Sequence, residues 1–340
     1  MKLPHLLILL CLGIIFVPCS IAIEGKPKLF STFADKKQVG SLGAMVYDGK
    51  YYWFSGSFSP TLQYDPIKKK FIKIDFGKPP QVEFVMCMEN VNGQIWIGLH
   101  TKGIAVYDKK TNKFKYYNMD NGLPGFIDNY GKKYCKVSAL AYDSVEKKVW
   151  AGVKDSGLAY FDLAKNQWYK INESIIKDKD IYSIAVTKDI IAFGTDQGLI
   201  YLNKQSNKWE QFNNLPENQG LTFLNIEQKT IFFVVRQGYT SFIARYNIDT
   251  HKYEIILKPE YNVGIKRFDK YLVITSDDGD GITFYNLSTK KSKTFNESHG
   301  LVSNWVNDVY FLDEDIWALT QEGISKAKIK DVMKELVEIN

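Results

Sequence analysis

Charged and aromatic side chains that could bind a ligand recur in short turns of this chain. Carboxylates and cations can hydrogen-bond the polar groups of a ligand, and exposed aromatic rings can cover a sugar face or an apolar patch on a protein. Three cations, Lys102, Lys154 and Arg236, would suit an acidic group on such a ligand. The binding set that we expect is His100, Lys102, Phe126, Tyr130, Lys154, Asp155, Asp196, Arg236, Asp277 and His299.

Patterns that would commit these residues to catalysis are missing from the sequence. It holds no nucleophile elbow, no Ser/His/Asp order, no phosphate loop and no Cys/His spacing typical of zinc. The acidic run 277–281 lacks the spacing and the distal Glu of a calcium loop. His100 and His299 are the minimum that a metal-dependent lyase would need, but the sequence places no carboxylate beside both. We therefore expect no catalytic residue, no cofactor and no metal ligand.

A repeated phrase shows which elements must position these side chains. The segment 96–108 begins with Trp-Ile-Gly, continues through Gly103 and ends in Tyr-Asp, and 150–162 and 192–203 follow the same phrase. A period near forty residues is typical of stacked supersecondary units. Each unit reads as four short strands, a to d; in the third unit we place them at 137–142, 149–153, 158–162 and 168–171. Strands b and c are almost continuously apolar, which indicates that both faces of each sheet are covered.

Seven units can be counted from the residues that end strand c: Asp65, Asp108, Asp162, Asn203, Asn247, Asn286 and Lys328. The seventh unit has strands a to c and no strand d, whereas 28–33 looks like a strand d without its a, b and c. The sequence therefore predicts an all-β, seven-bladed β-propeller whose ring is closed by the N-terminal strand joining the last blade. We assign the propeller to residues 23–330 and a C-terminal tail to 331–340.

Glycine and tryptophan positions within the repeat predict tight packing between blades. Gly98, Gly152 and Gly194 lie inside strand b, where a side chain would collide with a neighbouring blade. Three tryptophans occupy one strand b position in different repeats: Trp96, Trp150 and Trp317. We expect these rings to be buried packing residues and not sugar-stacking platforms.

The repeat resembles the two-component-regulator propeller repeat, which runs roughly Gly-Leu-Pro-Ser-Asn-x-Val, then Leu-Trp-Ile-Gly, Gly-Leu and Tyr-Asp. Here 122–124, 149–152, 157–158, 300–306 and 316–317 follow that pattern. The resemblance implies a periplasmic sensing propeller of the kind found in membrane-bound hybrid histidine kinases that sense carbohydrate fragments. The Ig-like domain, membrane span and kinase of those proteins are not in this sequence, so the expectation is a stand-alone exported protein.

The first 22 residues read as a secretory signal. An apolar run at 6–17 precedes Ser20 and Ala22, the small residues that a signal peptidase requires. We expect cleavage after Ala22 and a periplasmic or secreted protein. Lipoprotein anchoring through Cys19 is not expected, because Pro18 stands where a small residue should precede the lipidated Cys. No later apolar stretch approaches 18 residues, so stable membrane insertion after cleavage is not expected.

Charge and cysteine content narrow the classes of partner. The formal net charge of +6 rests almost entirely on lysine, and nucleic-acid readers favour arginine forks, so we expect no nucleic-acid partner. Two cysteines follow the signal, Cys87 and Cys135, and do not make a disulfide framework. Two buried, unpaired thiols are favoured, with a bridge between matching strands as the alternative.

One rim of the expected propeller should carry the binding set. In this fold the d–a and b–c connections share one rim, which surrounds the channel mouth, and the a–b and c–d connections share the other. The segment 118–136 is the one long departure from the repeat period, and it contains Phe126 and Tyr130. We expect a glycan or protein ligand at this rim, centred on that segment. The alternatives are a propeller-type lyase or hydrolase that acts on glycans or a cyclic compound at the channel mouth, and an assembly scaffold.

Overall fold

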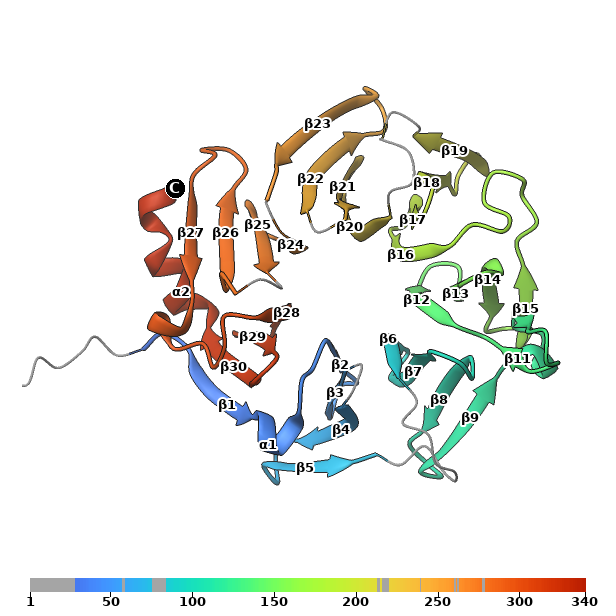
Figure 1. Ribbon diagram of the computed structural model, residues 1–340, viewed down its shortest axis with the longest axis horizontal. Coiled ribbons are helices and arrows are strands. Elements are labelled where there is room, and N and C mark those ends of the chain that lie inside the picture. Colours follow the sequence, from blue (N-terminus) through green and yellow to red (C-terminus); the bar gives the residue numbers. More distant parts are fainter. Residues whose placement is uncertain are drawn as a thin grey trace, which may run out of the picture.

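The computed structural model describes residues 28–56, 59–74, 84–212, 215, 220–238, 240–259, 261, 263–276 and 279–340. Within these residues seven four-stranded antiparallel sheets surround a common axis as the blades of a β-propeller (Figure 1). The all-β, seven-bladed fold expected from the repeat is thus confirmed. The expected signal, residues 1–22, and Asp277 lie outside the described residues.

Each blade runs from strand a at the axis to strand d at the periphery (Figure 1). Blade 1 has β2 (Ala44–Tyr47), β3 (Tyr52–Gly56), β4 (Ser59–Asp65) and β5 (Lys70–Lys73). Blade 2 has β6 (Val85–Val91), β7 (Gln94–Leu99), β8 (Ile104–Asp108) and β9 (Lys113–Tyr117). Blade 3 has β12 (Val137–Asp143), β13 (Lys148–Val153), β14 (Gly157–Asp162) and β15 (Gln167–Lys170). Blade 4 has β16 (Ile181–Val186), β17 (Ile190–Thr195), β18 (Gly198–Asn203) and β19 (Lys208–Phe212).

The second half of the ring follows the same order. Blade 5 has β20 (Leu221–Glu227), β21 (Thr230–Gln237), β22 (Thr240–Asn247) and β23 (Lys252–Leu257). Blade 6 has β24 (Val263–Phe268), β25 (Tyr271–Ser276), β26 (Ile282–Asn286) and β27 (Ser292–Phe295). Blade 7 has β28 (Val306–Leu312), β29 (Asp315–Thr320) and β30 (Gly323–Lys328), and its fourth strand is β1 (Ser31–Asp35).

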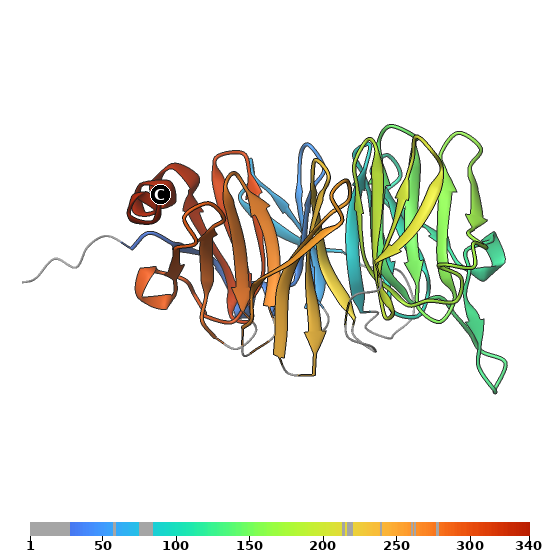
Figure 2. The same ribbon diagram turned by 90° about the horizontal axis from the view of Figure 1, so that it is seen from above.

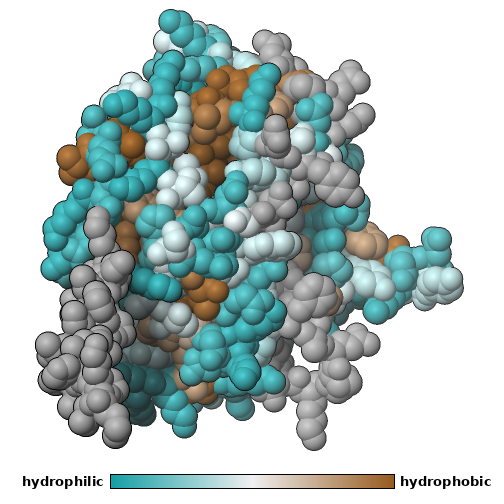
Figure 3. All heavy atoms as spheres, turned by 60° about the vertical axis from the view of Figure 1, so that its left-hand side comes forward, coloured by the Kyte–Doolittle hydropathy of each residue, from teal (hydrophilic) through white to brown (hydrophobic). Residues whose placement is uncertain are grey.

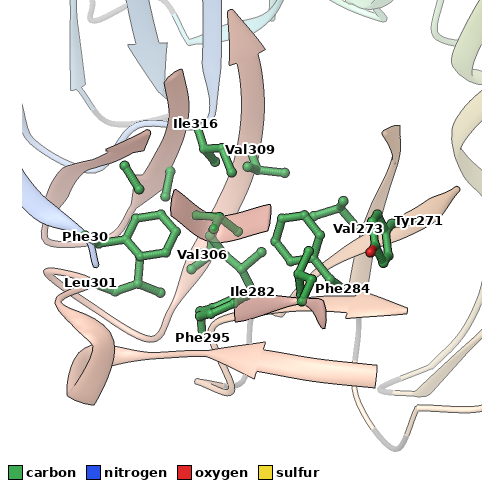
Figure 4. Close-up of a cluster of buried hydrophobic side chains, with 14 of the residues drawn as sticks. Phe30, Tyr271, Val273, Ile282, Phe284, Phe295, Leu301, Val306, Val309 and Ile316 are labelled. Carbon is green, nitrogen blue, oxygen red and sulfur yellow. The ribbon is translucent and has the colours of Figure 1, made fainter. Parts of the chain in front are cut away.

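The N-terminal strand closes the ring as expected. β1 pairs antiparallel with β30, and the Phe30 amide donates to the His299 carbonyl at 2.9 Å. Phe30 is buried between blades 6 and 7, where it packs with Phe295, Leu301 and Val306 (Figure 4). A short helix, α1 (Lys36–Val39), then leads into blade 1. The first and last segments of the propeller are therefore held by both backbone pairing and an apolar core.

Strands b and c carry the apolar core, as their continuous hydrophobic runs predicted. β17, β25 and β29 are buried along their whole length, whereas β6, β16 and β28 are half-exposed at most of their positions. In these three blades strand a is therefore less buried than strands b and c.

The expected packing between blades is confirmed at both residue types. A Cβ on Gly152 would lie 2.6 Å from Cβ of Ile181 in the next blade, and one on Gly194 would lie 2.4 Å from the Leu221 carbonyl oxygen. Trp96, Trp150 and Trp317 are at most 3% exposed. The repeated phrase therefore encodes contact between blades.

The acidic or amide residue that ends strand c has a local structural task. Asp65 Oδ1 accepts from the amides of Ile67 and Lys68, and Asp162 Oδ1 accepts from those of Ala164 and Lys165. Asn203 and Asn286 cap their c–d turns in the same way. Such Asx turns satisfy backbone donors that a tight connection leaves unpaired.

Residues beyond the last strand form helices that pack on the propeller. α2 (Ile329–Glu335) and the 3-10 turn η3 (Val337–Ile339) bury Val332, Leu336 and Ile339 in the core shared by blades 6 and 7. The Ile339 carbonyl accepts from Asn286 Nδ2 at 3.1 Å and from Thr289 Oγ1 at 2.7 Å. The segment 331–340, assigned as a tail from the sequence, thus contacts blade 6 closely.

The two described cysteines are unpaired. Burial raises the pKa of the Cys135 thiol to about 11, and burial also raises the pKa of the Cys87 thiol. Both groups are therefore held as thiols at neutral pH. None of the helices in the described residues is long and apolar enough to cross a membrane.

Candidate functional site

The two rims of the propeller present different side chains. We call near rim the rim formed by the b–c and d–a connections, such as 154–156 and 171–180, and far rim the rim formed by the a–b and c–d connections, such as 144–147 and 163–166. The nine described members of the expected binding set lie on the near rim or on the hairpin that projects from it. They do not form one cluster.

Four of them come together across blades 3 to 5: Lys154, Asp155, Asp196 and Arg236. The residue that joins the first three is Asp180, which immediately precedes β16. Asp180 Oδ1 accepts from the Asp155 amide at 2.8 Å, and its Oδ2 lies 3.9 Å from Lys154 Nζ. The Asp180 amide in turn donates to Asp196 Oδ1 at 3.1 Å. One carboxylate therefore fixes the b–c turn of blade 3 against that of blade 4.

Tyr182 continues this surface toward blade 5. Its side chain is 37% exposed, and its ring carbon Cε2 lies 3.0 Å from where a Cβ on Gly220 would stand. The Gly220 carbonyl accepts from the Arg236 amide at 3.1 Å, and the Arg236 guanidinium lies 5.6 Å from the centre of the Phe223 ring. We define the blade 3–5 patch as Lys154, Asp155, Asp180, Tyr182, Asp196, Gly220, Phe223 and Arg236.

A β-bulge near the start of strand a sets the direction of the aromatic side chains in the patch. The register of β16 shifts between Ile181 and Ser183, so Tyr182 is the extra residue. β20 shifts between Thr222 and Asn225, and Phe223 adopts a φ of 54°. A bulky residue with positive φ is a backbone outlier, and such strain gathers at functional sites. In blade 3 the bulge residue Ser138 instead donates to the Ile181 carbonyl at 2.5 Å.

Charge is distributed unevenly over the patch. On the side of blades 3 and 4 one cation, Lys154, stands among three carboxylates: Asp155, Asp180 and Asp196. Arg236 is the charged residue of the patch on the side of blade 5. Burial raises the pKa of the Tyr182 hydroxyl, and the charges of Asp180, Asp196 and Asp155 raise it further. Tyr182 therefore stays neutral and can donate a hydrogen bond. The patch offers an aromatic face with acceptors at one end and a cation at the other, which suits a ligand rich in hydroxyl groups.

Phe126 and Tyr130 lie on a hairpin at the outer edge of the ring. After the 3-10 turn η1 (Met119–Asn121), the segment forms β10 (Phe126–Ile127) and β11 (Lys133–Tyr134). It projects from the near rim beyond the blades, at the lower right of Figure 2. The Phe126 ring stacks on Tyr134 at 5.3 Å, while Tyr130 at the tip is 95% exposed. The structure does not bring this hairpin to the axis of the ring.

The two histidines lie in blades 2 and 6, which blades 7 and 1 separate. The His100 amide donates to the Phe84 carbonyl at 2.9 Å, and its ring meets Phe84 edge to face at 5.8 Å. Lys102 lies beside it and pairs with Cys135 through an isolated bridge. His299 Nδ1 lies 3.0 Å from Asn296 Oδ1 and accepts from the Asn296 amide at 3.3 Å. His299 therefore completes the cap of the 3-10 turn η2 (Glu297–His299), which holds the connection against β1.

Sequence reasoning missed Asp180, Tyr182 and Phe223, as well as Trp305, which is 45% exposed on the near rim of blade 7. A usable signal was present at three of these positions. Asp180 and Trp305 occupy the variable place just before strand a, and Tyr182 directly follows the first residue of that strand. An aspartate and large aromatic rings at places with no fixed packing role indicate contact with something outside the blade.

A second polar cluster lies near the axis on three strands a. Lys266 Nζ is 3.1 Å from Asp308 Oδ2 and 3.4 Å from the centre of the Tyr310 ring. Burial and then the charge of Asp308 raise the pKa of Tyr310, and Glu89 contributes further. Burial also raises the pKa of the Glu89 carboxyl to about 7. Within the part of the chain that the structure describes, no three His, Cys, Asp or Glu side chains stand close enough to hold a metal ion.

The outer surface between the rims carries both hydrophobic and hydrophilic side chains. On the side shown in Figure 3, hydrophobic side chains form separate areas among hydrophilic ones.

Two far-rim lysines have acidic partners in the preceding blade: Lys204 Nζ lies 2.5 Å from Asp143 Oδ2, and Lys109 Nζ lies 2.9 Å from Asp48 Oδ2. These cations link blades.

Comparison with known proteins finds likeness in structure alone. No family model matches the chain, and no curated protein sequence matches it. The extracellular domain of BT3049 from B. thetaiotaomicron, which is assigned to a hybrid two-component system, superposes with a TM-score of 0.69 at 16% identity. The extracellular domain of BT4673 from the same organism, also assigned to a hybrid two-component system, gives a TM-score of 0.66 at 17% identity. A third match is PorZ, a surface component of the type-IX secretion system of Porphyromonas gingivalis, with a TM-score of 0.59 at 15% identity.

These matches cover 88% of this chain and 42%, 40% and 39% of the three solved chains, respectively. The chain thus spans about two fifths of their length. At this identity the likeness shows the fold, a seven-bladed propeller similar to the extracellular domains of two-component systems. It does not carry their ligands or activities across.

Proposed function

We propose that this protein is an extracytoplasmic binding module that takes a glycan at the blade 3–5 patch. The observation that supports this most is the exposed Tyr182 ring, set between the carboxylates of blades 3 and 4 and the guanidinium of Arg236. Exposed aromatic faces stack on sugar rings, and flanking polar groups accept and donate hydrogen bonds to hydroxyls. The structural likeness to extracellular domains of two-component systems agrees with a sensing role outside the cytoplasm.

A panel of oligosaccharides tests the proposal. Binding of the full chain is measured by calorimetry and compared with Tyr182→Ala, and Tyr130→Ala serves as the matched control because it removes an exposed tyrosine from the hairpin. We expect Tyr182→Ala to weaken binding by about tenfold or more, as the loss of a central aromatic contact does. The control should bind as the parent does. Equal binding by the parent and Tyr182→Ala would contradict the proposed site.

The hairpin supports a second candidate function, the docking of a protein partner. Ile127 is 56% exposed and Tyr130 is 95% exposed, and both belong to the hairpin that projects beyond the blades (Figure 2). Tyrosine is among the residues that most often anchor protein interfaces. If Tyr130→Ala abolished recovery of a partner while glycan binding was unchanged, the two surfaces would serve different ligands.

A further inference from the structure

The three arginines of this chain differ in what their guanidinium groups contact. Arg245 Nε and Nη2 donate to Glu254 Oε2 at 2.9 and 2.6 Å, and Arg267 Nη2 donates to Glu227 Oε2 at 2.6 Å. Arg236 is exposed and contacts no carboxylate within the residues that the structure describes. Because lysine supplies nearly all other positive charge, an unpaired arginine is the exception in this chain.

The surroundings of Arg236 fix its backbone and leave its guanidinium accessible beside an aromatic ring. Its amide is bonded to the Gly220 carbonyl, and its side chain lies over the Phe223 ring, whose backbone has the left-handed φ of 54°. A guanidinium that stacks on a ring keeps its N–H donors at its edge, where they can meet a planar anion. Carboxylates take two parallel hydrogen bonds in that geometry.

Gly220 connects this cation to the rest of the patch. The Tyr182 ring packs against Gly220 from one side, while the Gly220 carbonyl holds the Arg236 amide on the other. A sugar ring on Tyr182 would therefore have Arg236 at one edge. The opposite edge is negative overall, because it holds three carboxylates, Asp155, Asp180 and Asp196, and one cation, Lys154. An anionic group is attracted to the first edge and repelled from the second, where hydroxyl donors are preferred.

We propose that the ligand is an acidic saccharide, bound with the carboxylate of a uronic acid on Arg236 and with a neutral sugar toward the aspartates of blades 3 and 4. This inference rests on the proposed function and adds the chemical class and the orientation of the ligand. The order of charges favours chains in which acidic and neutral units alternate over chains in which every unit is acidic.

The experiment compares acidic oligosaccharides with carboxyl-reduced forms of the same chains. Tetrasaccharides of hyaluronan and of rhamnogalacturonan serve as alternating acidic probes, and a glucuronoxylan tetrasaccharide carries a single acidic branch. Each is used with its reduced form, beside a galacturonate tetramer with an acid on every unit. A sulfated neutral tetrasaccharide tests whether the guanidinium binds sulfate instead. The variants are Arg236→Gln and, as the matched control, Arg245→Gln, which removes an arginine that already has a carboxylate partner.

We expect at least one alternating acidic probe to bind. Its affinity should fall about tenfold to a hundredfold on carboxyl reduction and by a similar factor in Arg236→Gln, as the loss of a charged hydrogen-bonding pair predicts. Arg245→Gln should bind the acidic probe as tightly as the parent does. The carboxyl-reduced probe should bind Arg236→Gln and the parent with the same affinity.

Three results would overturn the inference while leaving the proposed glycan site intact: neutral probes that bind through Tyr182 as well as acidic ones do, sulfate in place of carboxylate as the preferred group, or acidic binding that Arg236→Gln does not weaken. Tightest binding by the galacturonate tetramer would overturn the orientation. Failure of every probe, acidic and neutral, would contradict the proposed function itself.

Discussion

Blades 3 and 4 are joined at both rims by a lysine–aspartate pair, and the two pairs differ. On the far rim, Lys204 and Asp143 lie 2.5 Å apart with side chains that are 5% and 1% exposed. On the near rim, Lys154 and Asp180 lie 3.9 Å apart and are 38% and 18% exposed. The far-rim pair is a buried link in the scaffold, whereas the near-rim pair leaves its charges facing solvent. The same residue types thus form a buried link at one rim and leave their charges in solvent at the other.

Removal of Lys204 should have the largest effect on stability. Asp143 Oδ1 already accepts from the Val145 and Glu146 amides, and its Oδ2 depends on Lys204. Lys204→Ala would leave a buried carboxylate without its cation, which costs about 3–5 kcal/mol of unfolding free energy. Urea denaturation measures this change, with Lys252→Ala as an exposed far-rim control. A loss below about 1 kcal/mol would mean that the far-rim pair is no stronger than a surface pair.

A smaller effect on stability, one that depends on pH, is expected at Glu89. This residue lies between the two rims, on the axis strand β6. Burial raises the pKa of its carboxyl from 4.5 to about 7, so the unfolded chain ionises this group at a lower pH than the folded protein does. The resulting penalty is absent below about pH 4.5, grows between that pH and 7, and is complete above 7. Glu89→Gln should therefore leave stability unchanged at pH 4 and raise it by about 1–3 kcal/mol at pH 8.

Unfolding of the parent and of Glu89→Gln at both pH values checks this prediction, since other titrating groups cancel in the difference. A variant that is equally stabilised at pH 4 and pH 8 would show that the gain comes from packing. A variant that is destabilised at pH 8 would mean that the charged carboxylate is needed near the axis.

Contacts that recur from blade to blade, both within a blade and between neighbouring blades, were readable from the sequence. The seven residues expected to end strand c do so in the structure. Each stands at the same place in its blade, where the chain leaves strand c. Gly152 and Trp150 were read correctly because the fold demands a small and a large residue at fixed places. The closing strand was found because an unpaired strand d at one end matched a missing one at the other.

Contacts that cross blades at the rims were not readable in this way. Tyr182 reaches the surface through a bulge, and nothing in the sequence marks where a ladder shifts by one residue. Lys204 lies in a c–d turn, and the sequence does not reveal its pairing with Asp143, which stands 61 positions earlier. The sequence shows that the segment 118–136 is longer than the other connections between blades. It does not show that the hairpin lies at the outer edge of the ring, because that position depends on how blade 3 is oriented.

Separation of the near-rim pair should have the smallest effect. Lys154→Ala removes a cation that is 3.9 Å from its partner and more than a third exposed, and such pairs contribute between 0 and about 1 kcal/mol. Asp180 keeps its bond from the Asp155 amide, so the turn stays in place. Urea denaturation in low salt and in 0.5 M NaCl, a concentration of the order used to screen exposed charges, should show this small loss shrinking further. A loss above about 2 kcal/mol in both salts would mean that the near rim is held by internal pairing like the far rim, and that its charges are not reserved for a ligand.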